Sequence, residues 1–157
     1  MSEVKSDADL ECYKKTQEHR EAVANCLNEM ILIIKERAIN HDACKLESPE
    51  FEVFVEWTPK LASVTYGSEE YTEALKQMKP ALDHHYANSR HHVEHYLNGI
   101  KDMNLIDILE MFADWYCSTK RMKNGSIRHS IEINQKRFGY SDDLASILEN
   151  TIEVLDK

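Results

Sequence analysis

Apolar side chains recur at helical spacing along almost the whole chain. Between residues 22 and 38 they fall at the i, i+4, i+5 and i+8 positions that share one face of a helix. No stretch shows sustained alternation with β-branched side chains, and no internal repeat or linker divides the chain. The sequence therefore predicts an all-α fold: a single domain over residues 1–157, built as a bundle of six to seven helices, with a loose N-terminal tail at residues 1–8.

Capping residues and helix breakers set the expected helix boundaries. Ser48-Pro49, Ser126 and the Ser141-Asp142-Asp143 turn are typical of helix starts, and Gly139 is typical of a helix end. The first expected helices cover about residues 9–37, about 50–61, and a stretch that starts at residue 69. A histidine-rich helix then runs from Pro80 to about residue 96, and another from 105 to about 122. The last two run from the Ser126 cap to about residue 137 and from the Ser141 turn to about residue 155.

Composition narrows the class of protein. With 42% apolar and 30% charged residues in 157, the chain can bury a real core, which excludes a disordered or collagen-like protein. The net charge of −9 argues against broad binding to a nucleic-acid backbone, although it leaves room for a local pocket that takes one small phosphate ester.

Several further features indicate a protein of the cytoplasm. The longest apolar run, residues 30–34, is far shorter than the roughly 20 residues that a membrane span needs. Residues 1–9 are polar and acidic, without the apolar stretch of a secretory signal. The four cysteines form no C-x-x-C pair, which favours reduced, packed thiols. We therefore expect a cytoplasmic location and no membrane association.

The adjacent pair His41-Asp42 is the first candidate for chemistry. One short backbone segment here supplies a neutral nitrogen and an anionic oxygen, the ligand types that suit Zn, Mn, Fe, Co or Ni. His19 lies upstream on the first long helix, and Asp114 lies on a later helix whose acidic stripe also contains Asp107 and Glu110. Such a stripe is either a solvated face or the edge of a metal site.

Five of the eight histidines fall between His84 and His95. If this segment is helical, His84, His91 and His95 share one face, and His85, His92 and His95 share an adjacent one. Either set of histidines could point several nitrogens at one centre, so the sequence leaves the register open. The alternative without a functional role is a surface stripe of solvated histidines.

These residues resemble the H…HD…D signature of HD-domain metal-dependent phosphohydrolases. The segment His41-Asp42-Ala43-Cys44-Lys45 is similar to the HD-x-x-K form of that superfamily. Residues 111–115 resemble its closing helix, which contains two apolar residues followed by Ala-Asp. The resemblance implies an HD-like fold with His19, His41, Asp42 and Asp114 as ligands of a primary metal. It further implies a second ion bridged by Asp42 and held by His91 or His92 together with His85 or His95.

A narrower resemblance covers the chain from about His19 to its C-terminus. Residues 88–95, 103–107, 131–134 and the pair Arg137-Phe138 are similar to a family of short phage and bacterial proteins catalogued as a domain of unknown function. That family carries no activity over to this chain. If the protein is phage-encoded, the expected location is the host cytoplasm.

The HD resemblance implies metal-assisted hydrolysis of a phosphate ester. One or two divalent ions (Mn, Fe, Co, Ni, Zn or Mg) would lower the pKa of a bound water toward about 7 and polarise a phosphoryl oxygen. Lys45, Arg20 and Arg90 lie beside the expected ligands in sequence and could receive phosphate oxygens, with Lys120, Arg121 and Arg128 as less direct candidates. The expected partner is a small phosphorylated ligand such as a nucleotide, and an oligomer is possible.

Three other functions fit parts of the pattern. Residues 91–95 match H-x-x-E-H, in which two histidines hold zinc and Glu94 would act as the general base of a peptidase. The same donor types could hold two irons in an oxygenase. A non-catalytic protein that binds a metal or a nucleotide is the third alternative.

Overall fold

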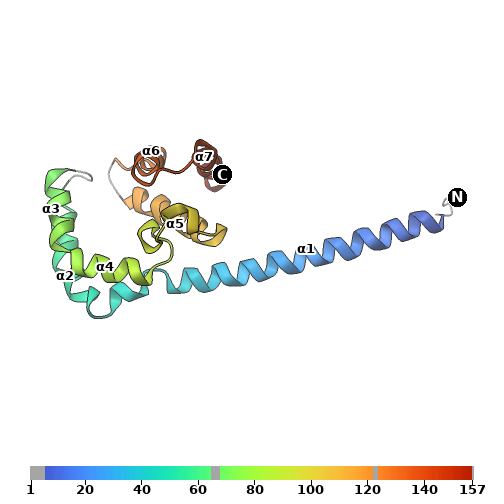
Figure 1. The fold of residues 1–157 in the computed structure, drawn as a ribbon, viewed down its shortest axis with the longest axis horizontal. Helices are drawn as coiled ribbons and strands as arrows, with labels where there is room; N and C mark the ends of the chain where they lie inside the picture. Colours follow the sequence, from blue (N-terminus) through green and yellow to red (C-terminus); the bar gives the residue numbers. More distant parts are fainter. Residues whose placement is uncertain (1–5, 65–67, 122–123, 157) are drawn as a thin grey trace. The chain divides into compact units, whose positions relative to one another are not determined.

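The computed structural model describes residues 6–64, 68–121 and 124–156. Within these ranges the chain forms seven α-helices and three short 3-10 helices, with no β-strand (Figure 1). The all-α prediction with six to seven helices is confirmed. The chain divides into two compact units, residues 1–39 and residues 40–157.

The first unit consists of one long helix, α1 (Asp7–Asn40), whose last residue belongs to the second unit. Asp7 and Asp9 lie in its first turn, where their negative charges interact favourably with the positive end of the helix dipole. Lys15 forms an ion pair with Glu11, one turn away, at 3.1 Å. The helix is longer at both ends than the expected 9–37. Residues 1–5 of the expected loose tail lie outside the described residues. Of its last three residues, Ser6 precedes the helix, and Asp7 and Ala8 already belong to it. No helix of the described chain is long and apolar enough to cross a membrane.

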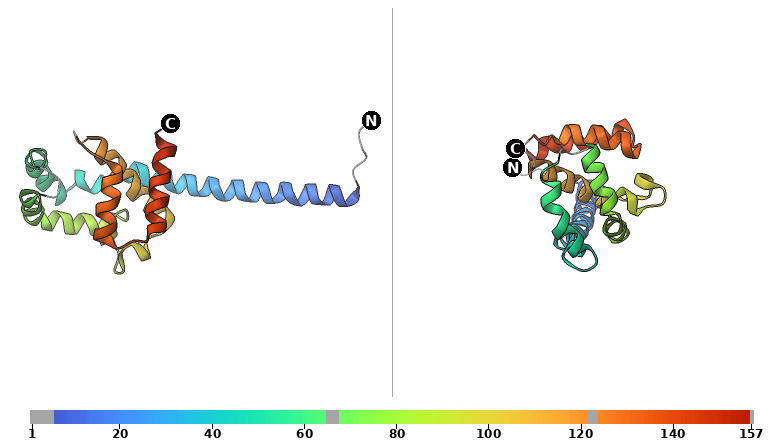
Figure 2. Two further views of the ribbon diagram at one scale, coloured as in Figure 1. Left: turned by 90° about the horizontal axis from the view of Figure 1, so that it is seen from above. Right: turned by 90° about the vertical axis from the view of Figure 1, so that its left-hand side faces the viewer.

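The second unit contains all the other elements. They are η1 (Ala43–Leu46), α2 (Glu50–Leu61), α3 (Glu69–Gln77), α4 (Lys79–Asn88), η2 (Val93–His95), η3 (Gly99–Asp102), α5 (Leu105–Arg121), α6 (Ile127–Phe138) and α7 (Asp142–Leu155). Side chains of α5, α6, α7 and the turn between α6 and α7 form its larger apolar core, and α6 lies beside α7 (Figure 2). The buried members of this core are Phe112, Tyr116, Ile131, Tyr140, Leu148 and Ile152.

Local capping explains most helix boundaries. Ser68, Ser126 and Ser141 each accept a hydrogen bond from a backbone N–H three residues later, as an N-cap does. Gly139 ends α6 in the left-handed conformation, with φ 67°. These boundaries agree with the expected ones within a few residues. The expected end of α5 at Met122 lies outside the described residues.

The histidine-rich helix is the exception, because α4 ends at Asn88 rather than near residue 96. Ser89 is extended, with φ −120° and ψ 99°, and residues 89–104 form a loop that contains the two short helices η2 and η3. Val93 and Met103 of this loop are buried against Met111 of α5. Tertiary packing of the loop therefore outweighs the helical spacing of its residues.

A buried carboxylate holds this loop on α5. The Asp107 side chain is 0% exposed and accepts hydrogen bonds from the Arg90 guanidinium at 3.2 Å, the Tyr96 hydroxyl at 2.7 Å and the backbone N–H of Asn104 at 3.1 Å. Because Arg90 directly precedes the His91-His92 pair, this network sets where the two imidazoles lie.

Replacement of Asp107 tests this anchor. Asp107→Ala would leave the Tyr96 hydroxyl and the Asn104 N–H without their acceptor, and we expect the free energy of unfolding to fall by about 3 kcal/mol. Urea unfolding followed by circular dichroism measures this change. Asp143→Ala, at an exposed position in the first turn of α7, is the matched control and should change stability by less than about 1 kcal/mol, because only its interaction with the helix dipole is lost. An equally small effect of Asp107→Ala would contradict the anchor role.

Candidate metal centre

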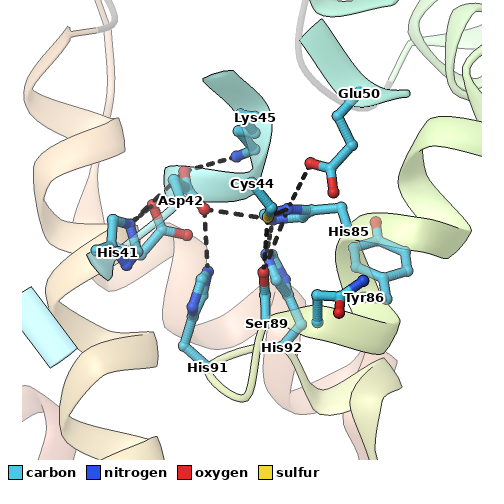
Figure 3. A network of polar contacts seen from close by, with 12 residues as sticks. His41, Asp42, Cys44, Lys45, Glu50, His85, Tyr86, Ser89, His91 and His92 are labelled. Atoms are coloured by element: carbon cyan, nitrogen blue, oxygen red, sulfur yellow. Dashed lines mark hydrogen bonds and ion pairs between the residues drawn. The ribbon is translucent and has the colours of Figure 1, made fainter. Parts of the chain in front are cut away.

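The His41-Asp42 pair lies at the turn between α1 and η1. Asp42 has φ 57° and ψ 14°, a left-handed conformation that short polar side chains such as aspartate tolerate better than most. The turn brings both side chains into a group of polar residues from η1, α2, α4 and the loop that follows α4 (Figure 3).

The two carboxylate oxygens of Asp42 face different partners. Oδ1 lies 3.3 Å from Nε2 of His85 and 3.5 Å from Nε2 of His91. Oδ2 lies 2.6 Å from Nζ of Lys45 and 3.7 Å from Nε2 of His41. Asp42 is therefore the residue that connects the histidines to the lysine.

Three histidines and Asp42 converge on one point. His85 and His92 face each other through their Nε2 atoms at 2.9 Å. One donor atom from each of Asp42, His85, His91 and His92 lies within 4.8 Å of the other three. The structure thus decides the register that the sequence left open: His85, His91 and His92 share the cluster, while the half-exposed His84 contacts Glu50 instead.

The donor separations fit a divalent metal ion. Ligands bound at about 2.1 Å lie about 3.0 Å apart at right angles and about 3.4 Å apart at the tetrahedral angle. The Nε2–Nε2 distance of 2.9 Å and the Oδ1–Nε2 distances of 3.3 and 3.5 Å cover this range. Two of the atoms, Asp42 Oδ1 and His91 Nε2, are buried and make no hydrogen bond within the described residues. Such atoms are costly in a protein interior unless a ligand satisfies them.

A second acidic group surrounds His41. Its Nδ1 donates a hydrogen bond to Oε1 of Glu110 at 2.9 Å, and its Nε2 lies 3.8 Å from Oδ1 of Asp114. Interaction with Asp114 and then with Glu110 raises the pKa of His41 to about 10, so these carboxylates favour a positive charge at this position. A metal ion would meet the same favourable field.

The other ionisable groups are in the states that metal ligands need. Burial opposes ionisation of Asp42, yet its contacts with His85 and the Lys45 ammonium lower its pKa below the usual range. Burial opposes ionisation of Asp114 as well, but its interactions with His41 and His91 together lower its pKa. Burial, followed by the neighbouring His91 and His85, lowers the pKa of His92 to about 3 and keeps that ring neutral.

Several residues predicted from the sequence are not members of this cluster. His19 and Arg20 belong to the first unit, and the cluster of the second unit is assembled without them. Arg90 pairs with Asp107, as described above. Glu94 accepts a hydrogen bond from Arg137 at 2.6 Å. His95 donates from Nδ1 to the Tyr86 carbonyl at 2.9 Å.

The more distant basic residues also have other contacts. Lys120 donates to the Tyr116 hydroxyl at 2.6 Å and lies over its ring. Arg128 lies 3.9 Å from carboxylate oxygens of Glu149 and Glu153. Lys45 is thus the predicted phosphate-binding residue that the structure places within the cluster of the second unit.

Sequence reasoning missed one buried residue beside the cluster. Glu50 is 0% exposed and contacts His84 and His85, but in the sequence it is an ordinary acidic residue in the first turn of a helix. Glu110 was predicted only as part of an acidic stripe, either solvated or facing a metal. No sequence signal indicates that each glutamate contacts two histidines, since their partners lie 19 to 69 positions away.

Comparison with known proteins identifies a family and no activity. The model of a family of unknown function, DUF5662, matches residues 8–154. No curated protein and no solved structure matches the chain.

Two histidine variants distinguish the cluster from its surroundings. His91→Ala removes one of the four converging donors, and we expect it to weaken Co²⁺ binding more than about 100-fold, beyond the usual cost of losing an outer contact. His95→Ala removes a histidine outside the group and should leave Co²⁺ binding unchanged. Titration of metal-free protein by calorimetry measures both. Loss of binding in His95→Ala alone would contradict this assignment of the ligands.

Proposed function

The chain belongs to DUF5662, a family of unknown function, and we propose that it is a metal-dependent phosphohydrolase of HD type that acts on a nucleotide or a related phosphate ester. Asp42, His85, His91 and His92 would hold one divalent ion. A second ion, if bound, would be held by Asp42 together with His41 and Asp114.

One observation carries the metal part of the proposal. Asp42 Oδ1 and His91 Nε2 are buried, face each other at 3.5 Å and make no hydrogen bond within the described residues. With Nε2 of His85 and His92 beside them, they form a three-nitrogen, one-oxygen donor set that suits Mn, Fe, Co, Ni or Zn. A divalent ion would satisfy both unpaired atoms at once.

The phosphohydrolase part rests on the neighbouring charges. When bound, the metal supplies a Lewis acid that polarises a phosphoryl oxygen and acidifies water. Lys45 Nζ lies 2.6 Å from Oδ2 of Asp42, and its side chain is 30% exposed, so it can turn from this carboxylate toward a phosphate oxygen. The adjacent His41-Asp42 pair and the Asp114 contact are the features that resemble HD enzymes.

The zinc-peptidase alternative has less support. The H-x-x-E-H motif needs its two histidines one turn apart on an α-helix. Here α4 ends before His91, His95 contacts the Tyr86 carbonyl, and Glu94 pairs with Arg137. The oxygenase and the binding protein use the same donors as the hydrolase and are separated by experiment.

Metal content is the first test. We expect about one to two equivalents of a divalent metal in the purified protein by mass spectrometry, and loss of that metal in Asp42→Ala. Asp83→Ala, an exposed aspartate on α4, is the control and should retain it. The metal-loaded protein should then release phosphate or a nucleoside product from a panel of nucleotides and phosphodiesters. Bound iron together with O₂ consumption would favour the oxygenase. Bound metal without turnover would favour a binding protein. If no metal binds under any loading condition, the proposal is overturned.

Lys45 offers a separate prediction about substrate binding. Lys45→Met removes the ammonium and keeps most of the side-chain volume against Phe54, over which the charge now lies. We expect unchanged metal content and a rise in KM of about tenfold or more, because a charged hydrogen bond to phosphate contributes about 1.5–3 kcal/mol. Steady-state kinetics measure this change. An unchanged kcat/KM would show that Lys45 does not contact the substrate.

A further inference from the structure

We propose that Glu50 and Glu110 are positioning residues that determine which ring nitrogen of the cluster histidines faces the metal. This inference rests on the proposed function, because it concerns the same metal centre. It assigns a role to two carboxylates outside the four-residue donor group of Asp42 and the three histidines.

Glu110 contacts one histidine from each part of the centre. Its Oε1 lies 2.9 Å from Nδ1 of His41 and 3.1 Å from Nδ1 of His91. His91 is 3% exposed and Glu110 is 12% exposed, so water competes little for these hydrogen bonds. Both rings turn their other nitrogen, Nε2, toward Asp42.

Glu50 makes the same arrangement on the opposite side of the cluster. Its Oε2 lies 3.1 Å from Nδ1 of His85, and its Oε1 lies 2.7 Å from Nδ1 of His84. Nε2 of His85 faces Asp42 and His92. Glu50 and Glu110 thus both accept from Nδ1 and leave Nε2 pointing inward.

This pattern selects one tautomer of each ring. A neutral imidazole has a single N–H, and only the nitrogen without it can bind a metal. A carboxylate accepts hydrogen bonds and donates none, so it draws that proton to Nδ1 and leaves the Nε2 lone pair free for the ion. Without Glu110 and Glu50, His91 and His85 could place the proton on Nε2 and present an N–H to the metal.

Stability alone does not account for these glutamates. A fully buried carboxylate such as Glu50 carries a desolvation cost that apolar side chains of similar volume avoid. Asp42, Glu110 and Asp114 add three more carboxylates to the same region, with Lys45 as a neighbouring lysine. A divalent ion at the donor group would offset this negative charge.

The experiment uses Glu110→Gln and reads the tautomers directly. A glutamine offers one acceptor oxygen and one donor NH₂, so it can accept from only one of the two rings and turns an N–H toward the other. Long-range ¹H–¹⁵N correlation spectra of the metal-free protein should show His91 and His85 protonated at Nδ1. In Glu110→Gln we expect His91 to shift its proton toward Nε2, while His85 keeps the Nδ1 form.

Metal affinity is the second readout. We expect the Kd for Co²⁺ to rise about 10- to 100-fold in Glu110→Gln and in Glu50→Gln, the usual cost of losing an outer carboxylate of a metal-binding histidine. Glu110→Asp keeps an acceptor and should recover part of the affinity. Glu52→Gln, an exposed glutamate on α2, makes the same charge change and should have no effect. Thermal unfolding of every variant checks that it folds, and if Glu50→Gln does not, Glu110→Gln decides alone.

The outcomes separate this inference from the proposed function. If the wild-type protein binds Co²⁺ but Glu110→Gln changes neither the tautomers nor the Kd, the positioning role is wrong and the metal site stands. If the tautomers shift as expected but no metal binds to the wild-type protein, the proposed function fails and Glu110 only orients the histidines. Nε2-protonated His85 and His91 in the wild-type protein would also overturn the inference.

Discussion

The second unit depends on how one carboxylate is partnered. Asp42 is half-buried in a left-handed turn, with two imidazoles near one oxygen and a lysine near the other. A carboxylate in such a place is costly unless charges and hydrogen bonds offset its burial. The Lys45 ammonium supplies part of this compensation. The unpaired Oδ1 atom indicates where a cation would supply the rest.

The cluster also depends on the end of α4 at Asn88, before the histidine-rich segment is complete. On a continuous helix, His85 and His92 would lie seven residues apart along one face, about 10 Å along the axis, and could not bring their Nε2 atoms to 2.9 Å. The chain instead leaves the helix after Asn88, and the Arg90–Asp107 contact holds the following loop against α5. The buried network at Asp107 thereby acts on the histidine cluster without touching it.

The helix boundaries could be predicted because their causes are local. Ser126, Ser141 and Gly139 act on backbone groups within four residues, and each acts as its residue type indicates. The pairing of Glu50 with His85, and of Glu110 with His41, joins residues 35 and 69 positions apart. Neither spacing nor residue type carries information about such contacts, so the sequence named candidate donors but not the two glutamates that contact them.

The sequence by itself determined the helical class and most helix ends, because periodicity and caps are properties of residues and their near neighbours. It also placed Asp42 and the histidine-rich segment among the candidates. Only the tertiary structure decided that His85, His91 and His92 converge while His84 and His95 turn away. That choice follows from the break after Asn88, where side-chain contacts with α2 and α5 outweigh the local preference for helix.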